Sequence, residues 1–433
     1  MTSAMLRSLI SGLSLIAFAA SASAQPAPTP PAKKPVAEAT EPPTTPPVEP
    51  VDHTALPPPA PTPPPPPAPT GEPPKKLLVG KDSPGASFAP GLLLQGWFVL
   101  DENTKPGATG DTNAATSTFR IRRVEISFGG DMVPGFVKYK FMFDPSRVRD
   151  TMTTTTATDP SGAPVTIRTP AGAISVLQDF YVTFQSKMAD ISIGQFKNTV
   201  SMEGYASSAK LILPERDFMA NLLGGQRDIG IRIDKAFKTF MYSLNVFNGA
   251  GQNTLDTNNQ KDISLRIEVS PVPGLTVGGN TYDSIGYRNR GGTKDRWEGD
   301  LRYERGPFLF QSEFIHARDV LSTGAKPVNG RGFYGAVAYR LGEFGAGNWK
   351  GVLQPAVRVG YYDPNIDVDL DPSMVAGSNF GGNDERMDYE VGLNYYVRAY
   401  ELKLQVGYDR QQFDNSSTKM PINEVIMAAQ VTF

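Results

Sequence analysis

Cysteine is absent from this chain of 433 residues, and histidine occurs only twice. Without cysteine the protein forms no disulfide and offers no thiolate to a metal or a redox centre. His53 lies in a proline-rich tract, and His316 is predicted on the apolar face of a strand, where no water-filled site would use it. Because hydrolases most often rely on a histidine base, this scarcity argues against an enzyme.

Familiar catalytic motifs are missing as well. The chain contains neither the Gly-x-Ser-x-Gly nucleophile motif nor the His-Glu-x-x-His zinc motif. The segment DVDLDP within 363–385 offers carboxylate oxygens to Ca²⁺, but it lacks the spacing of an EF-hand loop. A solvated acidic loop is the simpler interpretation. We therefore predict no catalytic residue, no metal site and no cofactor.

Long apolar runs and a strong net charge are also lacking. Beyond the N-terminus, no segment approaches the roughly twenty apolar residues of a transmembrane helix. The formal net charge of the whole chain is −2, which does not suggest a nucleic acid partner. A membrane location for this protein would therefore require β-strands.

The N-terminus has the three parts of a secretory signal. Arg7 precedes the apolar run 9–20, and Ala22-Ser23-Ala24 forms a small-x-small cleavage pattern. We expect residues 1–24 to be a signal peptide and the mature chain to begin near Gln25. No cysteine follows the pattern, which excludes a lipoprotein anchor there.

Residues 25–76 are dominated by proline. Such a composition cannot build a core and favours extended polyproline II, at ~3.1 Å per residue, so the segment could reach on the order of 150 Å. We predict a disordered periplasmic spacer that contacts the cell wall, with an inert disordered tail as the alternative.

Period-two alternation recurs through residues 77–433. In KDISLRIEVS, at 261–270, isoleucine, leucine and valine share one face while charged and polar residues share the other. The pattern predicts sixteen strands: 91–101, 117–129, 135–144, 174–184, 188–197, 227–234, 239–248, 261–270, 274–283, 296–305, 307–317, 331–341, 351–362, 386–397, 399–409 and 422–433.

Short turns alternate with long loops along this series. An even number of strands with that rhythm is typical of a transmembrane antiparallel β-barrel with periplasmic turns and external loops. A soluble β-sandwich would leave the many charges on the polar faces unpaired in a dry core, whereas a water-filled lumen accepts them. Aromatic residues near strand ends suit the interfacial girdles of such a barrel, and they are Trp97, Tyr181, Phe240, Trp297, Tyr303, Tyr361 and Tyr362.

One segment resembles a known family. Residues 193–203 read IGQFKNTVSME, close to the phrase V-G-Q-F-K-x-P-F-S-x-E of the phosphate-selective porin O and P family. Asn198-Thr199-Val200 departs from the proline and aromatic usual there. Further fragments fit in order, at 119–130, 177–184, 227–233 and 248–251. The resemblance implies a trimeric outer-membrane diffusion channel of a Gram-negative bacterium. In some members the channel is selective for phosphate or polyphosphate through lumen arginines and lysines.

The third long loop, 198–226, is the one that general porins fold into the pore. Selectivity comes from charge at such a constriction, although acids outnumber bases on the predicted lumen faces. We predict that Glu215, Arg216 and Asp217 pair locally to hold the loop to the wall. The candidates for contact with small anionic solutes are Lys197, Lys210, Lys138, Lys140, Arg123 and Arg232.

In the cluster RIRR at 120–123, alternation predicts that Arg123 points into the lumen. It predicts that Arg120 and Arg122 point outward, toward outer-membrane lipid or a neighbouring subunit of a homotrimer. Two alternatives to an anion channel stay open: a nonspecific general porin, and a structural or adhesive barrel that does not conduct.

Overall fold

The computed structural model describes residues 77–78, 85–102, 116–158, 164–170, 176–256, 258–284, 292–320, 323–367, 385–413 and 421–433. The predicted signal peptide at 1–24, the proline-rich spacer up to residue 76 and most of the acidic loop 363–385 lie outside these residues.

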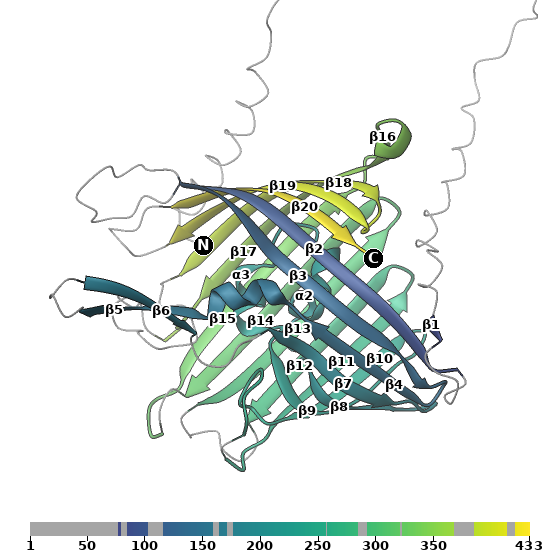
Figure 1. The fold of residues 1–433 in the computed structure, drawn as a ribbon, viewed down its shortest axis with the longest axis vertical. Helices are drawn as coiled ribbons and strands as arrows, with labels where there is room; N and C mark the ends of the chain where they lie inside the picture. Colours follow the sequence, from purple (N-terminus) through teal and green to yellow (C-terminus); the bar gives the residue numbers. More distant parts are fainter. Residues whose placement is uncertain are drawn as a thin grey trace, which may run out of the picture. The chain divides into compact units, whose positions relative to one another are not determined.

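Sixteen antiparallel strands form a closed barrel, which confirms the predicted fold class (Figure 1). The first and last barrel strands pair from Leu93↔Thr432 to Glu102↔Asn423 and complete the ring. The barrel strands are β2 (Ser87–Glu102), β3 (Thr116–Val133), β4 (Val137–Phe143), β7 (Leu177–Phe184), β8 (Asp190–Lys197), β9 (Arg227–Ala236), β10 (Phe240–Phe247), β11 (Asp262–Val272), β12 (Leu275–Ser284), β13 (Thr293–Arg305), β14 (Phe308–Val320), β15 (Val328–Tyr339), β17 (Gly351–Asp363), β18 (Arg386–Arg398), β19 (Leu402–Phe413) and β20 (Ile422–Thr432).

Short elements accompany the barrel. The two-residue strand β1 (Leu77–Leu78) pairs with the start of β2. A separate hairpin, β5 (Met152–Thr158) and β6 (Pro164–Pro170), extends beyond the barrel wall (Figure 1). The remaining elements are β16 (Glu343–Phe344), η1 (Pro145–Thr151), η2 (Ser208–Lys210), η3 (Gly347–Trp349), α2 (Met202–Tyr205) and α3 (Phe218–Leu223). None of the helices in the described residues has the length and apolarity needed to cross a membrane.

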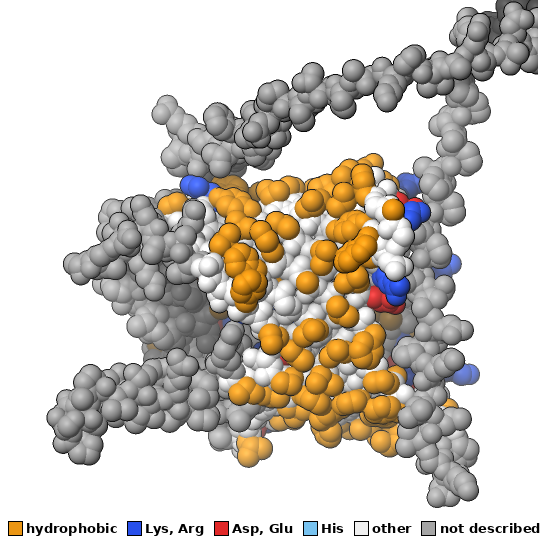
Figure 2. Space-filling view, turned by 45° about the horizontal axis from the view of Figure 1, so that its top comes forward, with side chains coloured by type: hydrophobic (Ala, Val, Ile, Leu, Met, Phe, Trp, Pro, Cys, Tyr) orange, Lys and Arg blue, Asp and Glu red, His pale blue; other side chains and the backbone are white. Residues whose placement is uncertain are grey.

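Alternation along each strand separates an apolar outer face from a polar inner one. On β11, Leu265, Ile267 and Val269 are exposed on the outside, whereas Ser264 and Arg266 are buried inside. Figure 2 shows hydrophobic side chains spread over the outer face of the strands in view, with few charged side chains among them. His316 also follows the prediction, since it lies on the outer face against the ring of Trp297.

A β-bulge in β3 overturns part of the prediction for RIRR. Gln95 of β2 pairs with Arg123 and the next residue, Gly96, pairs with Ile121, so Arg122 is an extra residue without a partner across the ladder. A bulge places two consecutive side chains on nearly the same side of a strand. The prediction that Arg122 points outward is therefore wrong, because Arg122 and Arg123 both reach a carboxylate inside the barrel.

Beyond the bulge, the strand faces are reversed relative to simple alternation. Phe119 and Ile121 are 82% and 58% exposed on the outside. Arg120 lies over the ring of Trp97, 4.8 Å from its centroid, and Trp97 is only 4% exposed. Arg120 thus does not point toward lipid, and Trp97 is not part of an outer girdle. Tyr362, which is also buried, is a second wrong assignment to the girdle, while Phe240 and Trp297 are exposed on the outside.

Candidate functional site

Residues 198–226 fold into the barrel, where α2 and α3 are seen within the ring of strands (Figure 1). Ser201 caps α2, since its Oγ accepts a hydrogen bond from the Gly204 N–H at 2.9 Å. Asp217 caps α3 in the same way through the Met219 N–H at 2.9 Å. These caps satisfy backbone donors that would otherwise be orphaned at the starts of two short helices.

The barrel wall holds this inward loop by its backbone carbonyls. The buried Lys403 of β19 donates to the carbonyl oxygens of Ala209 and Leu211 at 3.1 and 3.0 Å. Asn394 of β18 donates to the carbonyl oxygen of Ile212 at 2.8 Å. Because buried carbonyls are costly when unpaired, these donors fix the path of the loop across the lumen.

A buried ionic cluster also anchors the loop to the neighbouring strands β17 and β18. Arg358 of β17 is 1% exposed and donates to Glu203 of the loop at 3.1 Å and to the carbonyl oxygen of Glu215 at 3.1 Å. It also forms an ion pair with Glu390 of β18 at 2.6 Å. The predicted local pairing of Glu215, Arg216 and Asp217 with one another is wrong. Instead, the loop acids face cations of the wall, as Glu215 does with Arg122 and Arg123.

Beside the loop lies a cavity of about 290 Å³, here called the basic cavity. Its lining contains five cationic side chains and one acid, which are Arg123, Arg147, Lys197, Arg216, Arg227 and Glu125. The cations come from β3, η1, β8, the loop and β9, so elements distant in sequence bring them together. Such an excess of one sign in a narrow, low-dielectric space focuses the electric field.

Three of these cations are matched by carboxylates. Arg227 pairs with Asp179 at 2.7 Å and Arg147 pairs with Asp144 at 3.5 Å. Arg123 pairs with the loop residue Glu215. Each of the three therefore has a carboxylate at short range, although Asp179 also pairs with Lys140 and Glu215 also pairs with Arg122.

Lys197 and Arg216 have only neutral acceptors within hydrogen-bond distance. The Lys197 ammonium donates to the carbonyl oxygens of Gly204 and Ala206 at 3.1 and 3.3 Å. The Arg216 guanidinium donates to the carbonyl oxygens of Glu203 at 3.0 Å and Ala206 at 2.8 Å. Among the described residues neither cation has an ion pair with a carboxylate. Burial, together with the nearby Arg123, lowers the pKa of Arg216 to about 10, which leaves it charged at neutral pH.

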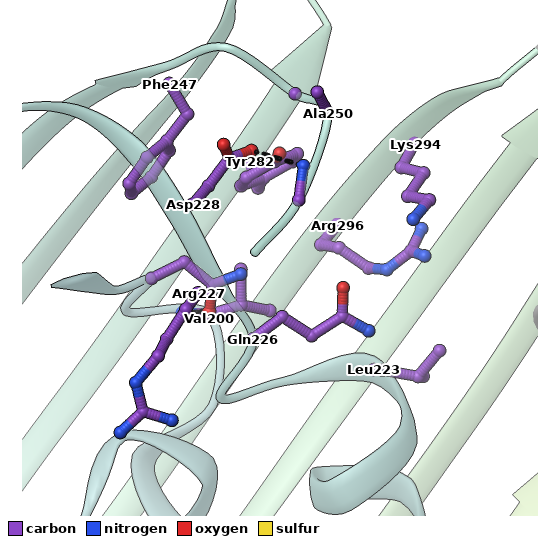
Figure 3. Close-up of a pocket in the computed structure, with 13 residues that line it drawn as sticks. Val200, Leu223, Gln226, Arg227, Asp228, Phe247, Ala250, Tyr282, Lys294 and Arg296 are labelled. Atoms are coloured by element: carbon purple, nitrogen blue, oxygen red, sulfur yellow. Dashed lines mark hydrogen bonds between the residues drawn. The ribbon is translucent and has the colours of Figure 1, made fainter. Parts of the chain in front are cut away.

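A smaller cavity adjoins the basic cavity and shares Gln226, Arg227 and Gly251 with it (Figure 3). Lys294 and Arg296 extend side by side from β13 into this region (Figure 3). Arg296 is already paired with Asp319 at 2.5 Å. The cationic lining thus continues toward the end of the barrel that carries the long loops.

The predicted lysines of β4 lie elsewhere. Lys138 and Lys140 line a separate cavity of about 420 Å³, together with Tyr181. Lys140 pairs with Asp179 at 3.4 Å. The structure therefore does not bring these lysines into one cavity with Lys197.

Of the other predicted residues, two line the basic cavity and two do not. Arg123 and Lys197 share the basic cavity. Lys210 is exposed at the end of η2 and does not line that cavity. Arg232 is buried, pairs with Asp234 at 3.1 Å and lies over the ring of Phe196, 4.7 Å from its centroid.

Sequence reasoning missed Arg147, Arg216 and Arg227 as members of the cavity. Arg227 begins a strand whose neighbour ends at Lys197, and the two residues are partners across the ladder. That adjacency could be read from a long loop joining two strands. No signal in the sequence identifies Arg147, because its place depends on how η1 folds back over β3.

A family model described as phosphate-selective porin O and P matches residues 100–288. Three solved structures share the fold. An anion-selective porin from Comamonas acidovorans is 11% identical, with 80% of this chain and 100% of that chain covered and a TM-score of 0.53. OmpF of Salmonella typhi in complex with daunomycin is 11% identical, with coverages of 81% and 98% and a TM-score of 0.52. The outer-membrane channel DcaP of Acinetobacter baumannii is 12% identical, with coverages of 82% and 100% and a TM-score of 0.51. No curated protein sequence matches the chain.

Proposed function

Residues 100–288 belong to the phosphate-selective porin O and P family, and from that premise we propose that this outer-membrane porin is an anion-selective diffusion channel. Its constriction is formed by the inward loop 198–226. Lys197 and Arg216 carry the selectivity, and small anions such as chloride and phosphate are the permeating solutes. Consistent with this role, we do not expect the protein to be an enzyme.

The observation that carries this proposal is the charge balance of the basic cavity. On the lumen faces predicted from the sequence, acids outnumber bases, but a permeating ion responds most to the charges at the narrowest point. There, Arg216 presents a positive charge that pairs with no carboxylate among the described residues, and the amino group of Lys197, which donates only to carbonyl oxygens, lies in the same cavity. The solved Comamonas porin of the same fold is described as anion-selective, which agrees with this reading.

The test is the reversal potential of the purified protein in a planar bilayer under a KCl gradient. The wild-type potential is expected to be directed toward chloride, and Lys197→Gln with Arg216→Gln should move it toward zero. Lys238→Gln, in an exposed turn between β9 and β10, is the control and should change nothing. A wild-type potential near zero would identify a general porin, and no conductance at all would identify a structural barrel.

Phosphate is examined by titration of the same chloride current. Block at low phosphate concentration that is lost in the double variant would support phosphate as a solute held at these two cations. Absence of block would restrict the proposal to small anions without phosphate preference.

We also propose a homotrimer, as the family resemblance implies. Its supporting feature is an aromatic cluster on the outer face of β2, β3, β4 and β7, in which neighbouring ring centroids lie 5.2 to 6.3 Å apart. The cluster consists of Phe88, Phe128, Phe141, Phe143 and Phe180. Phe141→Arg should reduce the trimer fraction seen by native mass spectrometry, and an unchanged fraction would exclude this face.

Finally, we propose that residues 1–24 are a signal peptide and that 25–76 form a periplasmic spacer touching the cell wall. The chain enters the barrel at the end with short turns, because Gly85 lies against Pro134 of the β3–β4 turn. Cell-wall pull-down with and without residues 25–76 tests the contact, and equal recovery would dismiss it.

A further inference from the structure

The bulge in β3 gives the lumen an arginine that regular alternation would have placed outside. Arg122 and Arg123 are consecutive, yet both guanidinium groups meet the same carboxylate of the inward loop. Arg122 donates to Glu215 Oε2 from Nε at 2.8 Å, and Arg123 donates to Glu215 Oε1 from Nη2 at 2.6 Å. Each carboxylate oxygen of Glu215 therefore accepts from its own arginine.

Other contacts hold the Glu215 carboxylate in this position. The Arg216 N–H donates to Glu215 Oε1 at 3.0 Å, and Arg358 donates to the Glu215 carbonyl oxygen at 3.1 Å. Burial alone would raise the pKa of Glu215, but Arg123 and Arg122 outweigh it and lower the pKa to about 2. The carboxylate is thus ionised under all conditions in which the channel would operate.

Glu215 also stands at the boundary between two parts of the lumen. Arg123 lines the basic cavity. Glu215 lines a second cavity of about 130 Å³, which shares Arg216 and Asn221 with the basic cavity. Acids outnumber cations in its lining, where Asp388, Glu390, Asp409 and Glu424 accompany Glu215, and Arg386 accompanies Arg216. The charge state of the Glu215–arginine group therefore influences both parts.

From this geometry we infer that Glu215 is a selectivity-determining residue. Its carboxylate partly neutralises the charges of Arg122 and Arg123, here called masking, and so keeps the anion preference of the channel moderate. This inference rests on the proposed anion channel. A porin of this fold without a masking acid would present Arg122 and Arg123 to the solute. Glu215 instead leaves the group with one net positive charge, so that Lys197 and Arg216 dominate the field.

Glu215→Gln tests the inference because it removes the negative charge while keeping the size of the side chain and one acceptor oxygen. Removing one negative charge within the constriction should raise the anion-to-cation permeability ratio on the order of threefold, because local potentials of about one kT or more act on both ions. Glu343→Gln is the matched control, since Glu343 pairs with Lys350 in an exposed turn, and it should leave the ratio unchanged.

A compensating variant separates unmasking from displacement of the loop. Glu215→Gln combined with Arg122→Gln restores the wild-type net charge of the group, so the permeability ratio should return to the wild-type value. A raised ratio that the second substitution does not reverse, or a Glu215→Gln ratio equal to wild type, would overturn the inference. A wild-type channel without anion preference would instead refute the proposed function, and the two failures are distinguishable in the same recordings.

Discussion

Single residues inside this barrel matter through their partners more than through their own charge. Arg358, Arg227 and Arg123 are cationic and face the lumen, yet each is matched by carboxylates at 2.6 to 3.1 Å. Buried ions are tolerated only when they are paired and hydrogen-bonded. Most lumen arginines therefore support the wall and the loop, and few remain to act on a solute.

Arg358 provides the first prediction at this scale. Arg358→Gln would leave the buried carboxylates of Glu203, Glu390 and Asp217 without their shared cation. Breaking a buried ion pair from one side costs about 3–5 kcal/mol, so the thermal unfolding temperature in detergent should fall clearly. Arg331→Gln is the comparison: the Arg331 side chain is 49% exposed and lies 3.8 Å from Asp363, and the expected cost is about 0–1 kcal/mol. Equal losses in both variants would contradict the role of the cluster.

Glu215 gives a prediction for pH. Its pKa of about 2 in the folded protein lies below the ordinary value of 4.5, because Arg123 and Arg122 overcome the effect of burial. A depressed carboxyl pKa contributes stability that is fully present above the unfolded value and is lost as pH falls through the folded one, about 3 kcal/mol here. Wild type should therefore lose more stability than Glu215→Gln between about pH 5 and 2. Parallel acid unfolding curves would argue against the ionic masking of the arginine pair.

At the scale of elements, the inward loop depends on a close approach of its two helical turns. Gly225 has φ +65°, and a Cβ atom there would lie 2.6 Å from the carbonyl oxygen of Gly204. Only glycine fits such a backbone conformation and contact at low cost. The close packing of α2 against the start of β9 thus requires that residue 225 has no side chain.

Gly225→Ala is expected to displace the loop. Strain in the left-handed region combined with the clash should cost about 1–3 kcal/mol, and the single-channel conductance should change because the constriction moves. Gly306→Ala is the control, since Gly306, in the turn between β13 and β14, also has a positive φ, of +58°, but nothing lies within 4 Å of its Cβ position. If both variants conduct like wild type, the loop does not set the width of the channel.

The element scale also separates what sequence reasoning could predict from what it could not. Strands such as β11 were predictable because period-two alternation is a local property of the chain. The bulge at Arg122 was not, because it is defined by the register between β2 and β3 rather than by either strand alone. The pairing of Lys197 and Arg216 with carbonyl oxygens required the path of the loop, which only tertiary contacts determine. The structure places Lys197 in the basic cavity, and its contact with anions stays a prediction.

On the scale of the whole molecule, many of the charged side chains in the described barrel wall lie in ion pairs. The chain is nearly neutral, with a formal net charge of −2, and ion pairs between strands of the barrel neutralise part of the wall. A distant solute would therefore experience little net field. Any anion preference has to arise over a few ångströms, at the constriction itself.

Ionic strength distinguishes selectivity that arises at the constriction from selectivity that arises from charges at the barrel mouths. The Debye length falls from about 10 Å at 0.1 M salt to about 3 Å at 1 M, so selectivity caused by charges at the barrel mouths would vanish in concentrated KCl. Selectivity caused by Lys197 and Arg216 acts on an ion in direct contact with them and should persist. We expect the wild-type anion-to-cation permeability ratio to remain above one at 1 M KCl, and the variant with both cations replaced by glutamine to show a ratio near one at every concentration. A wild-type ratio that declines to one at 1 M would locate the selectivity at the mouths, away from the loop.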